Sequence, residues 1–128
     1  LFLRVVFSFA TGNSDMHVKN FSLIETSACS QVYQLSEAYD LLPVNVIIPE
    51  DDEQLALTVN GKKHNIRRND FLKFADSSGI SREAAIKMIQ KIQSMRERYL
   101  KLCEESWLPE SMKERFCALI EERLRALG

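Results

Sequence analysis

The sequence predicts a mainly α-helical fold that carries small β-hairpins. Apolar residues from Ala85 to Leu102 recur in steps of three and four, which is the spacing of one buried stripe on a helix. A second stripe with the same spacing follows Pro109. Earlier in the chain, Asn60-Gly61 separates two short extended runs, and this dipeptide is the strongest short sequence signal for a hairpin.

The N-terminal part alternates between apolar and polar segments. Residues 1–10 are apolar nearly all round and predict a buried helix, although their phenylalanines and valines would also suit a strand. Residues 11–20 are rich in Gly, Asn, Ser and Asp, so we expect a loop. Short extended runs at 21–25 and 31–35 flank a small polar segment and predict a hairpin. Residues 41–52 contain two prolines and several acids, and predict an irregular segment that passes over the core.

A second hairpin and a short helix are expected next. The hairpin strands would be residues 54–59 and 62–66, joined at the Asn-Gly dipeptide, whose two residues tolerate positive φ. Asn69 or Asp70 can then cap a short helix, which we expect to stop at Gly79 because glycine commonly ends helices.

Two longer helices complete the predicted fold. Ser81 is a suitable N-cap for a helix that we expect to continue without interruption to about residue 106. Pro109 suits the first turn of the last helix, because the missing N–H of proline would have no helical partner there. The face that we expect this last helix to bury contains Met112, Phe116, Leu119, Ile120, Leu124 and Leu127.

Size, charge and hydropathy fit one ordinary domain. The chain has 128 residues, of which 45% are apolar and 27% are charged, and this is enough to build one core. A net charge of −1 provides no field that would attract nucleic acid or an anionic membrane. The apolar start contains Arg4 and is shorter than the roughly 20 residues of a membrane helix. We therefore expect neither membrane insertion nor direct nucleic-acid binding.

The cysteines and the first residue give two further expectations. Cys29, Cys103 and Cys117 are odd in number and lack C-x-x-C spacing, so we expect reduced thiols and a cytoplasmic protein. The first residue is Leu1 rather than methionine. We expect one domain, residues 1–128, that belongs to a longer chain.

The polar loop carries two residues at a spacing that is used in phosphoryl transfer. Asp15 and Asn20 form the pattern D-x-x-x-x-N, the catalytic-loop spacing of protein kinases. In that loop the aspartate orients the attacking hydroxyl and accepts its proton, and the asparagine binds a magnesium ion through its oxygen. Lys19 could pair with Asp15 and the transferred phosphate. His17 is either a brace for the loop or a core histidine.

Asp40 is the candidate for a second metal ligand. The strand that leaves the loop after Asn20 and the strand that returns have similar lengths, so the chain comes back to the same end of the hairpin. We therefore expect Asp40 to lie near Asn20, although 20 residues separate them. Taken singly, each residue has an ordinary interpretation as a turn residue, a cap or a solvated charge. The combination of the spaced loop residues, a hairpin and then an aspartate favours a functional site.

Two strings are more specific than a generic kinase loop. GNSDMHVKNFSLI, followed after the predicted hairpin by SEAYDLLP, resembles the C-terminal domain of the HipA family of bacterial toxin serine/threonine kinases. The family patterns are roughly G-N-x-D-x-H-x-K-N-F-S and P-x-Y-D-L-L. The matching residues are Gly12, Asn13, Asp15, His17, Lys19, Asn20, Phe21 and Ser22 in the first pattern, and Tyr39, Asp40, Leu41 and Leu42 in the second.

This resemblance implies a protein-kinase-like C-lobe, a helical lobe that lacks the N-lobe gripping the nucleotide. It implies Asp15 and Lys19 as catalytic residues, with Asn20 and Asp40 as ligands of Mg²⁺. ATP would be the phosphoryl donor, a protein would be the acceptor, and a DNA-binding antitoxin would be a possible partner. Because the chain has no Gly-rich loop and no strand lysine for the phosphates of ATP, we expect it to be inactive alone. The N-lobe would come from the parent chain or from a second chain.

Two other functions stay open. A kinase lobe without its partner lobe could serve as a non-catalytic protein-interaction module. A metal-dependent hydrolase that uses His17 with the aspartates is a weaker alternative, because no second histidine stands at ligand spacing.

Overall fold

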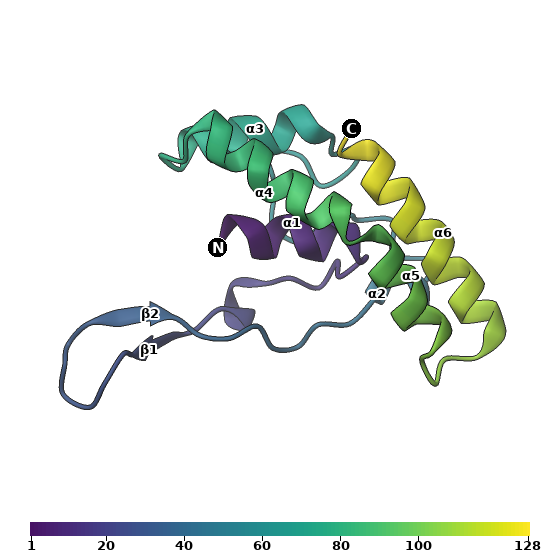
Figure 1. Cartoon of the computed structure of the whole chain (residues 1–128), viewed down its shortest axis with the longest axis horizontal. Helices are drawn as coiled ribbons and strands as arrows, with labels where there is room; N and C mark the ends of the chain where they lie inside the picture. Colours follow the sequence, from purple (N-terminus) through teal and green to yellow (C-terminus); the bar gives the residue numbers. More distant parts are fainter.

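The computed structural model describes residues 1–128 as six α-helices, one 3-10 turn and one two-stranded antiparallel sheet (Figure 1). The prediction of a mainly helical chain with a small hairpin is thereby confirmed. No helix has the length and the apolar composition that crossing a membrane would require. In chain order the elements are α1 (Phe2–Ala10), η1 (Val18–Asn20), β1 (Leu23–Glu25), β2 (Tyr33–Leu35), α2 (Val44–Ile47), α3 (Arg68–Ser77), α4 (Arg82–Ser94), α5 (Arg96–Glu104) and α6 (Glu110–Ala126).

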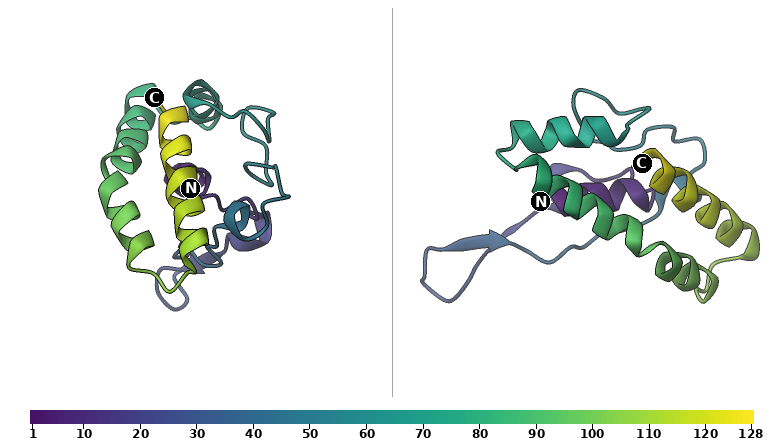
Figure 2. Two further views of the ribbon diagram at one scale, coloured as in Figure 1. Left: turned by 90° about the vertical axis from the view of Figure 1, so that its right-hand side faces the viewer. Right: turned by 45° about the horizontal axis from the view of Figure 1, so that its top comes forward.

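Helix α1 forms the centre of the core, as its apolar sequence predicts. Figure 2 shows α1 end-on, with α4 and α6 beside it, and both of these helices contact it. Phe9 is fully buried, and its ring packs edge-on against Phe71 of α3 with 5.2 Å between centroids. Burying such a side chain stabilises a fold by about 1.5–3 kcal/mol. The loop that follows α1 therefore starts from a firmly packed helix.

Strands β1 and β2 form a hairpin that projects away from the helices (Figure 1). Leu23 pairs with Leu35, and Glu25 pairs with Tyr33. The Glu25 carboxylate accepts hydrogen bonds from backbone N–H groups in the connecting turn, at 3.2 and 3.3 Å. The predicted hairpin is confirmed, with strands of three residues each.

The second predicted hairpin does not form its strands. Asn60 and Gly61 adopt φ of 51° and 75°, as the turn requires. Between the predicted strands, however, the structure has only the bridge between Val59 and Lys62 and one further hydrogen bond, from the N–H of Gln54 to the carbonyl of Lys63 at 2.9 Å. The reason is that the preceding backbone bonds elsewhere: the N–H of Ala56 donates to the carbonyl of Ser14 at 2.8 Å. The predicted strands at 54–59 and 62–66 were therefore wrong, while the turn itself was right.

The long helix predicted from Ser81 is interrupted at Met95. Ser81 does cap α4, since its hydroxyl accepts from the N–H of Ala84 at 3.2 Å. Met95 lies outside the helical region, at φ −90° and ψ 7°, and separates α4 from α5. Helix α4 packs against α1 and α3, whereas α5 packs against α6. Because of the break, the apolar stripe packs against different helices before and after Met95. The prediction of a single helix was therefore wrong.

Two smaller differences concern the remaining elements. Residues 44–47, predicted to be irregular, form the single helical turn α2 after Pro43. The N-cap of α3 is Arg67, and Asp70 supports that helix end from its first turn by accepting the Arg67 N–H at 2.9 Å. The three cysteines are unpaired, and burial together with the neighbouring Cys117 raises the pKa of the Cys103 thiol to about 12.

Candidate functional site

The loop after α1 is held by backbone contacts before it reaches Asp15. The N–H of Asn13 donates to the carbonyl of Ser8 at 2.9 Å, and the carbonyl of Gly12 accepts from the N–H of Asn45 at 3.1 Å. Gly12 has φ of 69°, and a Cβ at this position would lie 2.9 Å from Cδ2 of Leu119 in α6. The left-handed conformation therefore favours glycine here, and a larger residue would also have to displace the end of the Leu119 side chain.

A distant segment fixes the residue directly before Asp15. The hydroxyl of buried Ser14 donates to Oδ2 of Asp51 at 2.6 Å, and Oδ1 of Asp51 accepts from the N–H of Glu53 at 3.1 Å. The side-chain amide of Asn45 donates to the carbonyls of Asp51 and Glu53 at 3.0 and 2.9 Å. Residues 45–56 thus form a frame for the loop.

Asp15 and Asn20 come together as their spacing predicts. The amide nitrogen of Asn20 donates to the backbone carbonyl of Asp15 at 2.9 Å. Asn20 is buried, and no protein group donates to its amide oxygen. The Asp15 carboxylate is 49% exposed, and its Oδ1 lies 2.9 Å from Nε2 of His17. His17 is therefore not a core histidine, because its ring is half-exposed and braces Asp15.

Tyr39, the residue before Asp40, bonds to the backbone of Lys19, the residue before Asn20. Lys19 is exposed on η1 and makes no ion pair. The Asp15 carboxylate contacts His17 and not Lys19. The hydroxyl of Tyr39 donates to the carbonyl of Lys19 at 2.9 Å and lies 2.7 Å from the hydroxyl of Ser22. This tyrosine ties the backbone that carries Asp40 to the turn that carries Asn20.

The Asp40 carboxylate has no protein partner. Asp40 is exposed, its φ is 55°, and it forms no ion pair or side-chain hydrogen bond. No cluster of three or more His, Cys, Asp and Glu side chains is placed to hold a metal ion. Among the predicted site residues, the oxygen atoms without a protein partner are the amide oxygen of Asn20, Oδ2 of Asp15 and the carboxylate of Asp40.

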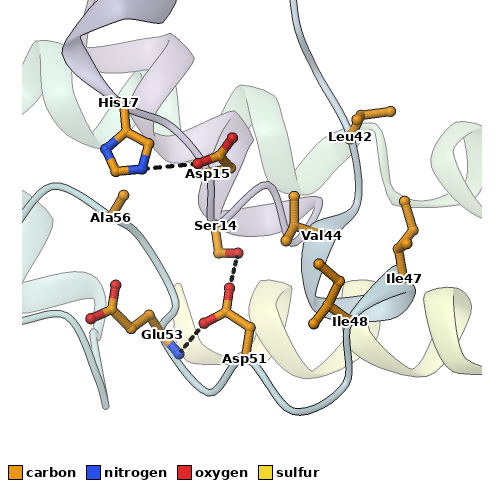
Figure 3. Close-up of a pocket in the computed structure, with 10 residues that line it drawn as sticks. All are labelled: Ser14, Asp15, His17, Leu42, Val44, Ile47, Ile48, Asp51, Glu53 and Ala56. Atoms are coloured by element: carbon orange, nitrogen blue, oxygen red, sulfur yellow. Dashed lines mark hydrogen bonds and ion pairs between the residues drawn. The ribbon is translucent and has the colours of Figure 1, made fainter.

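A pocket of about 520 Å³ opens beside Asp15 (Figure 3). Figure 3 shows Asp15 and His17 on one side of it and a group of aliphatic side chains on the other. The lining residues are Ser14, Asp15, His17, Leu42, Val44, Ile47, Ile48, Asp51, Glu53 and Ala56.

A match to a protein-family model identifies the family of this chain. The family model described as HipA-like C-terminal domain matches residues 1–99, which include the loop, the hairpin, the Asp40 segment and helices α1 to α4. The chain belongs to the HipA-like C-terminal domain family. The resemblance inferred from the two sequence strings is thereby confirmed.

One curated relative of this HipA-like domain carries a functional description. A protein of Haemophilus influenzae (strain ATCC 51907 / DSM 11121 / KW20 / Rd), named "Putative kinase", is 24% identical over 126 residues. The match covers 86% of this chain and 36% of the relative. The HipA-like domain thus spans about a third of the length of that relative.

The frame of the loop in this HipA-like domain includes residues that the sequence interpretation missed. Arg123 of α6 is buried, and its guanidinium lies 5.0 Å from the centroid of the Phe9 ring. It also donates to Oδ1 of Asn45 at 3.5 Å. Burial lowers the pKa of Arg123. A sequence signal existed, because Arg123 occupies the apolar stripe of α6, three residues after Ile120.

Proposed function

We propose that this chain is the catalytic and magnesium-binding lobe of a HipA-like serine/threonine protein kinase. The reaction is transfer of a phosphoryl group from ATP to a protein hydroxyl. The observation that carries the proposal is the hydrogen bond from the amide nitrogen of buried Asn20 to the backbone carbonyl of Asp15, at kinase spacing in a chain of this family. It leaves the Asn20 oxygen free beside a residue whose carboxylate is half-exposed. The curated relative named as a kinase supports the same reaction class.

The proposed chemistry needs one group to receive a proton. The oxygen of the acceptor hydroxyl attacks the γ-phosphorus of ATP, the bond to the β–γ bridging oxygen breaks, and the hydroxyl proton passes to Asp15. Oδ1 of Asp15 is held by His17, so Oδ2 is left for the hydroxyl. Lys19 lies next to Asn20 and adds a positive charge for the phosphate being transferred.

The oxygen donors beside Asp15 fit magnesium. Asn20 uses its amide nitrogen inside the loop and keeps its oxygen for a cation, and the Asp40 carboxylate has no protein partner. Magnesium prefers such oxygen ligands and, when bound, would neutralise charge on the phosphates. Tyr39 supports this assignment, because it fastens the Asp40 segment to the carbonyl of Lys19.

The family resemblance also suggests the biological setting. We place the proposed kinase in a toxin–antitoxin system, in the cytoplasm, with a protein substrate and a DNA-binding antitoxin as partner. The nucleotide-binding N-lobe would be supplied by the parent protein or by a second chain.

The test is Asp15→Asn in a protein that contains this chain together with its N-lobe. Loss of the proton acceptor is expected to lower the phosphorylation rate by about 10²- to 10⁴-fold. The free energy of unfolding should change by no more than about 0.5 kcal/mol, because the carboxylate is half-exposed. Rates come from transfer of labelled phosphate, and stability comes from urea titration.

Asp52→Asn is the matched control, since Asp52 is exposed and its carboxylate has no partner. The control should keep the full rate. An Asp15→Asn protein that retains wild-type activity, or that unfolds, would mark Asp15 as structural.

A non-catalytic interaction module is the second candidate. The hairpin favours it, because its exposed apolar side chains suit a protein surface rather than water. The exposed residues are Leu23, Ile24, Val32 and Tyr33. Unchanged biological activity in Asp15→Asn, combined with loss of activity on substitution of these residues, would favour the module.

A further inference from the structure

The pocket beside Asp15 has two chemically different walls. Ser14, Asp15 and Asp51 contribute polar atoms, while the facing wall is aliphatic (Figure 3). Leu42, Ile47 and Ile48 form most of that wall. They come from the segment directly after Asp40, so one stretch of chain serves both the proposed metal ligand and the pocket.

The charge of the lining does not favour a triphosphate. Three carboxylates line the pocket, from Asp15, Asp51 and Glu53, and no lysine or arginine does. Lys63 pairs with Glu53 at 2.9 Å but lies outside the lining. Without a cationic lining residue, and with neither Asn20 nor Asp40 in the lining, the pocket has little to attract the phosphates of ATP. We therefore do not assign the nucleotide to this pocket.

The proposed metal ligands lie outside the lining of the pocket. Neither Asn20 nor Asp40 lines the pocket, whereas Asp15 does. Asp15 thus belongs to the pocket lining and, through the hydrogen bond of its backbone carbonyl, also contacts Asn20. In a phosphoryl transfer the donor and the acceptor approach from opposite directions, roughly in line.

The aliphatic wall is incompletely covered in the folded chain. Leu42, Ile47 and Ile48 are 53%, 44% and 50% exposed. Three such side chains lining one pocket of about 520 Å³ provide apolar surface that a bound apolar group would remove from water. The size lies within the range of about 300–1,000 Å³ that is usual for ligand sites.

We propose that this pocket is the acceptor-peptide subsite, an inference that rests on the proposed kinase function. It binds a large aliphatic side chain of the protein substrate, close to the serine or threonine whose hydroxyl reaches Asp15. The carboxylates select against acidic residues at the same place. Ile47 and Ile48 are then specificity-determining residues.

Binding is tested on the 128-residue chain by methyl NMR of its isoleucines. The probe is a short peptide with one serine flanked by leucines, and the comparison peptide has aspartates in place of the leucines. The leucine peptide should shift the methyl signals of Ile47 and Ile48 and leave Ile24 unmoved. Ile24 is a matched control, at 45% exposure on the distant hairpin. Equal shifts from both peptides, or shifts of Ile24 alone, would overturn the subsite.

Turnover is tested with Ile48→Ala in the protein that includes the N-lobe. Loss of the aliphatic contact is expected to lower kcat/KM for the leucine peptide by about tenfold or more, with KM for ATP unchanged. Leu102→Ala, on α5 and 56% exposed, should leave both values unchanged, because Leu102 does not line the pocket. Phosphorylation of the leucine and aspartate peptides at equal rates would overturn the subsite and leave the kinase proposal intact. Peptide shifts at Ile48 without any phosphoryl transfer would instead overturn the kinase proposal, and the acceptor role with it.

Discussion

At the scale of single residues, the site separates side chains that react from side chains that hold them in place. Asp15 reaches solvent, whereas Ser14 before it is buried and bonded to Asp51. His17 is the one side chain that contacts the Asp15 carboxylate directly, at 2.9 Å. A carboxylate held from one side keeps its second oxygen in a fixed direction. His17 is therefore a positioning residue in the proposed reaction.

The first residue-scale prediction concerns His17. His17→Ala should lower kcat by about tenfold through misplacement of Asp15, while KM for ATP stays unchanged, because His17 contacts no proposed nucleotide ligand. His17→Gln should recover much of the loss, since its amide N–H can donate to the same carboxylate. His64→Ala is the control, because His64 is exposed and bonds only the carbonyl of Asp52. Steady-state kinetics that show equal kcat for wild type and His17→Ala would exclude the positioning role.

At the scale of elements, the site joins parts that are distant in sequence. Residues 45–56 frame the loop after α1. Helix α6 packs against this frame, where its Leu119 lies close to Gly12 and its Arg123 donates to Asn45. The pair Asp15 and Asn20 could be predicted, because a short loop fixes their spacing locally. The bonds of Ser14 with Asp51 and Ala56 could not, because they join segments about forty residues apart and no local pattern marks them.

The same distinction explains the errors in predicting the elements. The Asn60-Gly61 turn is a local property and was predicted, but its strands depend on whether the Ala56 N–H bonds across the hairpin or to Ser14. The interruption at Met95 depends on which helices pack against the residues before and after it. Beyond it, Arg96 forms an ion pair with Glu121 of α6, and nothing in the apolar spacing of α4 and α5 distinguishes two helices from one.

The element-scale prediction concerns the start of α3. Asp70 is buried, and although burial tends to raise its pKa, hydrogen bonds from Asn60, Lys62 and the Arg67 backbone lower the pKa overall. Because the folded pKa lies below the unfolded value, the carboxylate stabilises the fold above the unfolded pKa of about 3.9. That stabilisation is lost as the pH falls through the folded pKa.

Asp70→Asn should therefore lower the free energy of unfolding by about 1–3 kcal/mol at pH 7, because an amide cannot accept from both Asn60 and Lys62. The difference from wild type should shrink as the pH is lowered below about 4. Urea titrations across this pH range measure it, with Asp76→Asn on the exposed side of α3 as control. A difference that persists unchanged at low pH would show that the carboxylate charge is not the cause.

At the scale of the whole molecule, the proposed kinase has its acceptor side and its metal ligands in this chain but little to hold a nucleotide. The four glycines, at 12, 61, 79 and 128, form no Gly-rich loop. The pocket beside Asp15 has no cationic lining residue. In protein kinases a Gly-rich loop covers the phosphates of ATP and a strand lysine contacts them.

The chain alone is therefore expected to bind Mg-ATP with a Kd no tighter than about 1 mM, or about −4 kcal/mol. Isothermal titration of Mg-ATP into the 128-residue chain measures this, and the protein with its N-lobe provides the comparison, for which micromolar binding is expected. Micromolar binding by the chain alone, with phosphorylation of a peptide, would mean that this lobe grips the nucleotide itself. Weak binding by both proteins would instead remove the support for a kinase and leave the interaction module as the better account of the fold.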